Sequence, residues 1–291
     1  SMESYYNAKQ GKFGLVELNE RYKGLKLPEV MFSDLKRERR LKNMNSHFSN
    51  FLLEEMDQVL KKGEQVILFQ NRRGYTPLWS CEICNWTPKC NNCDVSLTYH
   101  KHANHLKCHY CGFTANPVGS CPSCGSTRLN MIGFGTEKIE DELSLIFKDK
   151  IIKRLDLDTT RAKNAYEEIL NDFDNGFIDI LIGTQMVTKG LDFDNVYLVG
   201  ILDADMLLNR PDFRAYERSY QLMSQVSGRA GRLGKQGRVI IQTGDPDHWV
   251  IQLVAEHNYQ KFYENEIIER KNFNYPPFYK VISLMVKHKN I

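Results

Sequence analysis

All eight cysteines of this 291-residue chain fall between residues 81 and 124. They form four C-x-x-C pairs with no thiol left over: Cys81/Cys84, Cys90/Cys93, Cys108/Cys111 and Cys121/Cys124. Disulfides would need an oxidising compartment, and nothing in the sequence indicates secretion. A redox C-x-x-C would be a single pair beside a βαβ pattern. Four thiolates suit tetrahedral zinc, so we predict two four-cysteine zinc sites, with iron–sulfur clusters as the alternative.

The spacing between the pairs predicts how they combine. Fourteen residues separate Cys93 from Cys108, close to the interval between the two halves of a zinc ribbon. This predicts one site from the two inner pairs and a second, enclosing site from the two outer pairs. Sequential pairing, which would leave only five residues between the first two pairs, is the alternative. We expect the nearby histidines to lie at the surface or behind the ligands: His100, His102, His105 and His109.

The segment from 80 to 126 is therefore expected to be a small domain that cannot fold without metal, because structural zinc supplies on the order of 10 kcal/mol or more of folding free energy. A catalytic zinc keeps an open coordination position, and four thiolates leave none, so the metal should be structural. Trp86 and Tyr110 inside this segment could stack on a nucleic-acid base or pack a small core, and we favour packing.

Composition limits the broad class of protein. The length suits about two domains, and the net charge of +3 permits nucleic-acid binding without arguing for it. The basic run at 35–42 is typical of a solvated helical face. There is no apolar run of membrane-spanning length and no secretory leader pattern. We expect the sequence to be part of a longer protein at both ends.

Outside the cysteine segment, strand-like and helix-like stretches alternate. Short apolar runs at 64–71 and 195–205 are typical of buried strands, and 48–63 is typical of an amphipathic helix that ends at a glycine. Such alternation predicts an α/β fold with a parallel sheet covered on both faces by helices.

Three stretches contain polar or charged residues that could bind phosphate groups. "QVSGRAGR" (225–232) offers two arginines flanked by glycines, which suits bidentate phosphate binding or, more plainly, two surface cations at a helix end. "LIGTQMVTKGLDF" (181–193) and "LFQNRRGYTP" (68–77) are strands that run into polar loops able to contact phosphates.

Taken along the chain, from 68–77 through 181–193 to 225–232, the three stretches resemble motifs IV, V and VI of superfamily 2 helicases. The cysteine segment directly after "NRRGY", together with "CPSCGS", "GTE", "DFRAYERSYQ", "GRAGRLGKQG" and "YPPF", narrows the resemblance to the PriA-type replication-restart helicases over about residues 50–280. The fold implied is a RecA-like parallel-sheet second helicase lobe with an inserted ribbon-like minidomain that holds the two zinc sites.

The resemblance also implies residue roles. Arg229 and Arg232 would face the ATP γ-phosphate, as arginine fingers do. The remaining roles implied are ATP binding by Gly190 and Asp192, and DNA binding by Arg72, Arg73, Thr184 and Gln185.

The activity implied is ATP-driven 3′-to-5′ DNA unwinding at stalled or abandoned replication forks, leading to restart by primosome assembly. The cofactors implied are ATP and Mg²⁺ beside the two zinc ions. The partners implied are forked DNA with single-stranded/duplex junctions, single-stranded DNA-binding protein and other primosome proteins. A monomer in the bacterial cytosol, associated with the nucleoid and with no membrane, is expected.

The sequence departs from the complete helicase pattern in one respect. It contains no G-x-x-x-x-G-K-[ST] motif and no Walker B acidic pair, which belong to the first RecA-like lobe. We therefore expect this chain alone to hydrolyse no ATP. The alternative function is a non-enzymatic zinc-ribbon module that binds DNA or protein on an α/β scaffold. A metabolic α/β enzyme is disfavoured because no dinucleotide fingerprint is present.

The expected domain organisation follows from these assignments. Residues 1–45 would link the two lobes, the helicase lobe would comprise 46–79 and 127–255, the zinc insert 80–126, and a truncated C-terminal domain would begin in 256–291.

Overall fold

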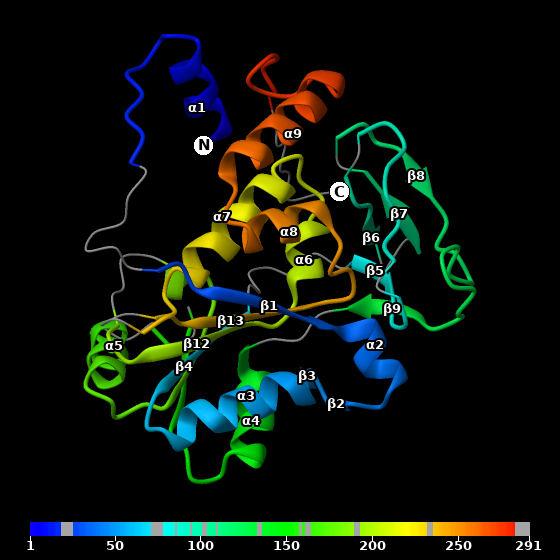
Figure 1. Ribbon diagram of the computed structural model, residues 1–291. Helices are drawn as coiled ribbons and strands as arrows, with labels where there is room; N and C mark the ends of the chain where they lie inside the picture. The colour runs from blue at the N-terminus through cyan, green and yellow to red at the C-terminus, as the bar shows by residue number, and fades with distance from the viewer. Residues whose placement is uncertain are drawn as a thin grey trace.

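The computed structural model describes residues 1–18, 26–70, 78–84, 86–93, 95–100, 104–108, 110–132, 136–156, 159–160, 164–188, 193–231 and 235–282. Two sheets dominate this part of the chain (Figure 1): a parallel sheet at the centre and a smaller antiparallel sheet beside it. None of the described helices is long and apolar enough to cross a membrane.

The central sheet has six strands, and every neighbouring pair is parallel. In spatial order the strands are β1 (Glu29–Asp34), β13 (Arg238–Thr243), β12 (Val196–Ile201), β4 (Gln65–Phe69), β11 (Ile180–Gly183) and β10 (Ile152–Leu155). The parallel sheet expected from the sequence is confirmed.

Burial on both faces explains the near-continuous apolar runs of these strands. Along β4, Val66 and Leu68 face one core cluster, whereas Ile67 and Phe69 face the other. All four side chains are at most 1% exposed. Each face of the sheet therefore supports a separate hydrophobic layer.

Helices cover the two faces unequally. One face is covered by α3 (Asn50–Lys61) and α4 (Thr136–Ile146). The other face is covered by α5 (Ala165–Asp174), α6 (Ala204–Leu208), α7 (Ala215–Ser227), α8 (Trp249–Ala255) and α9 (Tyr259–Asn272), as Figure 1 shows. The α3 helix matches the sequence prediction: Ser49 caps its start, and Gly63, with a φ of +74°, follows its end.

The cysteine segment forms the second sheet, which is antiparallel and has five strands. In spatial order these are β8 (Thr114–Ala115), β7 (His105–Lys107), β6 (Thr98–His100), β5 (Leu78–Cys81) and β9 (Leu129–Ile132). Its first and last strands, β5 and β9, pair with each other, Leu78 opposite Ile132. The insert therefore leaves and rejoins the lobe at adjacent points, and its sheet reaches slightly beyond the expected range of 80–126.

Residues 1–45, which we expected to link two lobes, also contribute a strand and a helix to this lobe. The β1 strand is an edge strand of the central sheet, and the basic helix α2 (Leu35–Arg40) follows it. At the chain start, α1 (Met2–Lys9) buries Met2 completely against the lobe. A strand that pairs with β13, about two hundred residues away, leaves no local signal, because parallel pairing is set by tertiary contacts.

The segment expected to begin a separate domain also packs on the lobe. Phe262 and Tyr263 of α9 belong to the core cluster formed with α7 and α8. Residues 259–272 therefore share one hydrophobic core with the central sheet.

A short antiparallel pair, β2 (Met44–Asn45) with β3 (Phe48–Ser49), precedes α3.

Candidate functional site

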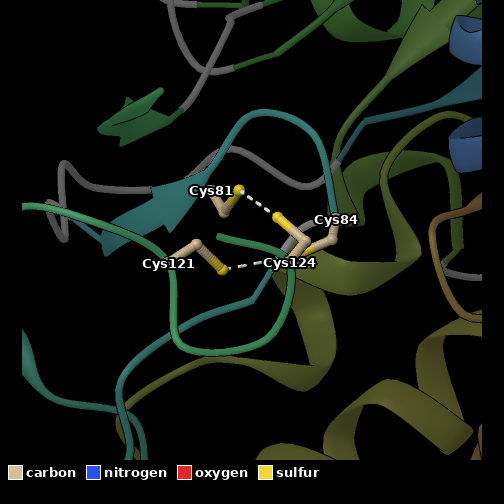
Figure 2. Close-up of side chains that lie close together, drawn as sticks. All are labelled: Cys81, Cys84, Cys121 and Cys124. Atoms are coloured by element: carbon tan, nitrogen blue, oxygen red, sulfur yellow. Dashed lines mark hydrogen bonds between the residues drawn. The ribbon is translucent and has the colours of Figure 1, made fainter. Parts of the chain in front are cut away.

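The structure groups the eight cysteines into two clusters of four, as the nested pairing predicts. One is Cys81, Cys84, Cys121 and Cys124 (Figure 2), and the other is Cys90, Cys93, Cys108 and Cys111. All eight thiols are free, and the ligand atoms within each cluster lie within 4.8 Å of one another.

The sulfur–sulfur distances distinguish metal ligation from disulfides. They are 3.6 Å for Cys81 to Cys124, 3.5 Å for Cys84 to Cys121 and 3.6 Å for Cys90 to Cys111. A disulfide would require about 2.05 Å. Tetrahedral zinc with bonds of about 2.3 Å separates its sulfurs by about 3.8 Å. Both clusters therefore have dimensions that fit a tetrahedral ion.

One backbone hydrogen bond recurs in all four C-x-x-C turns. The N–H of the first cysteine donates to the carbonyl five residues later, at 2.8–2.9 Å: Cys81 to Trp86, Cys90 to Val95, Cys108 to Phe113 and Cys121 to Ser126. Gly112 and Gly125 follow the second cysteine of their pairs with φ of +76° and +73°, a conformation that glycine adopts without strain. The turns are thus built alike from backbone geometry.

The ionisation of the thiols also favours a bound cation. The backbone N–H of Phe113 lowers the pKa of Cys111 to about 6, whereas burial raises the pKa of Cys84 to about 12 and also raises that of Cys93. The inner cluster thus combines a thiol that ionises readily, Cys111, with one that resists ionisation, Cys93. Neighbouring thiolates repel one another, and a divalent ion would remove that repulsion.

Neither cluster includes a histidine among the described residues. His105 lies half-buried on β7, outside both groups. His102 and His109 lie outside the described residues, as does the side chain of His100. The donor set is four sulfurs per cluster, which is typical of structural zinc.

The helicase-like residues occupy two opposite edges of the central sheet. Thr184 follows the carboxyl end of β11, and Gln185 begins the 3₁₀-helix η2 (Gln185–Thr188). Thr184 is 3% exposed, and its buried hydroxyl oxygen has no hydrogen-bond partner among the described residues. The carboxyl edge of a parallel sheet is where α/β proteins bind ligands.

Arg229 lies at the amino edge instead. It follows the end of α7, and the N–H of Gly231 donates to the carbonyl of Val196 at the start of β12, at 2.9 Å. Gly231 has a φ of +81°, and a Cβ atom there would lie 2.1 Å from the nitrogen of Gly237. The second glycine of "GRAGR" therefore allows two backbone segments to touch beside the arginine.

The Arg229 guanidinium is only partly solvated. Its Nε is buried without a hydrogen-bond partner among the described residues, and burial lowers its pKa. An unpaired buried guanidinium nitrogen is costly, so it favours an anionic ligand.

Five of the residues implied by the resemblance lie outside the described residues: Arg72, Arg73, Gly190, Asp192 and Arg232. Of the implied residues that are described, Thr184 and Gln185 follow the carboxyl end of β11, whereas Arg229 lies in the segment that contacts the start of β12.

The described aromatic residues of the insert favour packing. The phenol oxygen of Tyr110 accepts a hydrogen bond from the N–H of Phe213 at 3.3 Å, and its ring lies edge-on to Phe213 and Tyr275. Trp86 is half-buried in a cleft of about 530 Å³ between the insert and the lobe. Phe213 lies in "DFRAYERSYQ" and Tyr275 in "YPPF", and no local pattern in either stretch predicts their contact with Tyr110, which only the folded structure reveals.

Comparison with known proteins agrees with this geometry. The family model described as the PriA DNA helicase Cys-rich region domain matches residues 90–115, which contain the inner cysteine cluster. The model of the helicase conserved C-terminal domain matches residues 130–234, from β9 to the segment after α7.

Curated relatives match almost the whole chain. It is 44% identical to the replication restart protein PriA of Bacillus subtilis over 292 residues, which covers 100% of this chain and 36% of the relative. The PriA of Synechocystis is 44% identical, covering 92% of this chain and 33% of the relative. The PriA of Haemophilus influenzae is 39% identical, covering 100% and 40%.

Among solved structures, RecG bound to a three-way DNA junction matches with a TM-score of 0.44 and 13% identity, over 85% of this chain and 23% of that one. A likeness at that level is too distant to support an inference. The family models and the curated relatives, however, agree with each other and with both cysteine clusters. The chain belongs to the PriA family of replication restart proteins.

Proposed function

We propose that this chain supplies the second RecA-like lobe and the zinc region of an ATP-dependent 3′-to-5′ DNA helicase that restarts replication at abandoned forks. The observation that carries the proposal is the match to PriA relatives along 100% of the chain, with both the cysteine clusters and the parallel sheet in place. Because the chain spans 36% of the length of the Bacillus relative, the complete site requires further parts of the protein.

The amino edge of the sheet would form this lobe's half of the ATP site. Arg229 and Arg232 would stabilise the charge that develops on the transferred phosphoryl group, while Gly190 and Asp192 would contact the nucleotide with its Mg²⁺. The unpaired buried Nε of Arg229 supports this role, because an anion would satisfy it.

The carboxyl edge would contact DNA. Thr184 and Gln185, with Arg72 and Arg73 after β4, would bind backbone phosphates, which gives salt-sensitive and sequence-independent affinity. The unpartnered hydroxyl of Thr184 supports a polar ligand there. Nucleotide and DNA would thus occupy opposite edges of one rigid sheet.

Each cysteine cluster would hold one structural Zn²⁺. The domain ranges 46–79 with 127–255 for the lobe and 80–126 for the insert remain our proposal, with β1 and α9 packing on the lobe. Forked DNA, single-stranded DNA-binding protein and other primosome proteins are the proposed partners of a monomer in the bacterial cytosol. This chain alone, lacking the phosphate-binding lysine and the Mg²⁺ ligands of a first lobe, would hydrolyse no ATP.

The test is Arg229→Ala in the full-length protein. We expect DNA-stimulated ATP hydrolysis to fall by about 10³-fold, the magnitude typical of an arginine finger. Arg40→Ala, an exposed arginine of α2, is the matched control and should leave the rate unchanged. Undiminished hydrolysis in Arg229→Ala would instead favour the non-enzymatic zinc-ribbon module.

A further inference from the structure

Among the described residues, Arg39 of α2 donates a hydrogen bond to the carbonyl of Glu82 in the insert at 3.0 Å, and two further groups of side chains join the zinc insert to the lobe. Near the outer cysteine cluster, the Thr87 hydroxyl donates to the Asn209 side-chain oxygen at 2.9 Å, and Lys89 Nζ donates to the Tyr216 hydroxyl at 3.0 Å. Near the inner cluster the contact is aromatic and centres on Tyr110. Tyr110, which is 38% exposed, is the aromatic residue that the insert places in this second group.

Three aromatic rings from distant parts of the sequence meet in the second group. Phe213, just before α7, stacks on Tyr275, after α9, with ring centres 4.6 Å apart. Tyr110 approaches both rings edge-on, at 6.2 Å and 6.1 Å. These are favourable geometries for aromatic pairs. We call Tyr110, Phe213 and Tyr275 the aromatic joint.

Hydrogen bonds fix the joint to both units. The Tyr275 hydroxyl donates to the carbonyl oxygen of Cys93, a residue of the inner cysteine cluster, at 3.1 Å. The Tyr110 hydroxyl lies 3.5 Å from a carboxylate oxygen of Asp212 and accepts from the N–H of Phe213. Each unit therefore reaches the backbone of the other.

A buried cation holds the lobe side of the joint in place. Arg270 is 1% exposed and bonds to Glu217 of α7 at 2.7 Å and to Glu266 of α9 at 3.1 Å. It also donates to the carbonyl of Pro276 at 3.3 Å, next to Tyr275, and its guanidinium lies 5.4 Å from the Phe213 ring centre. Both lobe rings are thus anchored to one buried arginine.

The α7 helix connects the joint to the proposed nucleotide edge. Its first residue, Ala215, lies two positions after Phe213, and its last, Ser227, lies two before Arg229. A helix of 13 residues spans about 20 Å. A displacement of Arg229 along this helix would therefore be transmitted to the joint.

We propose that Tyr110, Phe213 and Tyr275 are positioning residues that hold the zinc insert in register with α7, so that events at the nucleotide edge act on the insert. The expected effect on DNA unwinding rests on the proposed function, whereas the contacts of the aromatic joint do not. The joint itself can be tested without any activity.

The first test uses the chain described here and measures amide hydrogen exchange in wild type, Tyr110→Ala and Tyr110→Phe. We expect Tyr110→Ala to raise exchange at least about threefold in segments 209–214 and 273–279, with zinc content unchanged. Tyr110→Phe should keep 273–279 protected because its ring still packs there. Phe177→Ala, which removes a 63% exposed aromatic from the lobe, is the control. Unchanged exchange in Tyr110→Ala would overturn the joint.

The second test uses the full-length protein and compares ATP hydrolysis with fork unwinding. We expect Tyr110→Ala to keep DNA-stimulated hydrolysis within about twofold while unwinding falls about tenfold or more, and Tyr110→Phe to restore unwinding. Equal loss of both activities, or a Phe variant as defective as Ala, would overturn a positioning role. A wild type that neither hydrolyses ATP nor unwinds would refute the proposed function, while the exchange experiment would still decide the joint.

Discussion

The parallel-sheet lobe and the zinc insert are stabilised by different means. The lobe buries two extensive apolar clusters, one on each face of its sheet. Among the described residues of the insert there is one small cluster, and two of its six buried members are cysteines of the inner site: Cys90, Val95, Leu97, Tyr99, Leu106 and Cys108. Apolar burial can offset the conformational entropy of the lobe, whereas the insert needs metal–sulfur bonds in addition. The two units should therefore respond differently to the same perturbation.

Metal removal should produce the largest difference in stability between the insert and the lobe. Because structural zinc contributes on the order of 10 kcal/mol or more, a strong chelator should unfold the insert and leave the lobe folded. Native mass spectrometry should find two zinc ions per chain before treatment and none after it. Amide exchange should then show loss of protection in 78–132 with retained protection in β4, β11 and β12. Simultaneous unfolding of both units would contradict this comparison.

A cavity in the lobe should have the converse effect. Leu68 on β4 is fully buried, and Leu68→Ala should lower the free energy of unfolding by about 3 kcal/mol. Zinc affinity, measured by competition with a chromogenic chelator, should not change. Ile151→Ala removes an apolar side chain that is 52% exposed and is the matched control. Weakened zinc binding in Leu68→Ala would show that the two units share one folding equilibrium.

Acid should weaken zinc binding by the insert, but it should strengthen the contribution of one buried carboxyl to the stability of the lobe. Zinc affinity falls as pH falls, because the thiolates take up protons. In the lobe, burial raises the pKa of Glu266 to about 7, even though Arg270 opposes that shift. A carboxyl whose folded-state pKa is raised contributes stability at low pH, and this contribution is lost as pH rises from about 4.5 to 7.

Glu266→Gln keeps the side chain neutral and isolates this contribution. As pH rises from about 4.5 to 8, wild type should lose about 1–3 kcal/mol of stability relative to the variant. Urea unfolding followed by circular dichroism across this pH range measures the change. A stability difference between the two proteins that does not change with pH would contradict the raised pKa of Glu266.

The smallest expected effect concerns one helix start. The Ser49 hydroxyl accepts a hydrogen bond from the Leu52 N–H at 3.2 Å and caps α3. Ser49→Ala should cost about 1 kcal/mol of lobe stability. Ser49→Gly should cost only a few tenths of a kcal/mol, because glycine is tolerated at an N-cap and places no charge at this fully buried position. Both variants should bind zinc as tightly as wild type does.

The sequence predicts elements that carry their own local pattern. Local sequence patterns predict three of the elements: the apolar run of β4, the amphipathic period of α3 and the residues flanking α7. The interval from Cys93 to Cys108 predicts how the cysteine pairs combine into two clusters. The β1 strand and the aromatic joint carry no comparable signal. Val30 pairs with Val239, and Tyr110 meets Tyr275, only after the chain has folded. Contacts across such sequence distances depend on packing, which a local pattern does not encode.

The pairing of β5 with β9 has a consequence for how the insert can vary. Since Leu78 and Ile132 are cross-strand neighbours, the two chain connections between the lobe and the insert lie side by side in one antiparallel strand pair. For the lobe, the whole insert is therefore equivalent to a loop whose two ends are as close together as those of a short hairpin turn. The entropy of closing a loop grows slowly with its length, so the insert could be enlarged, shortened or exchanged at little cost to the sheet. The contacts of Tyr110 with Phe213 and Tyr275 would then be one of the few constraints that the lobe places on the insert beyond this strand pair.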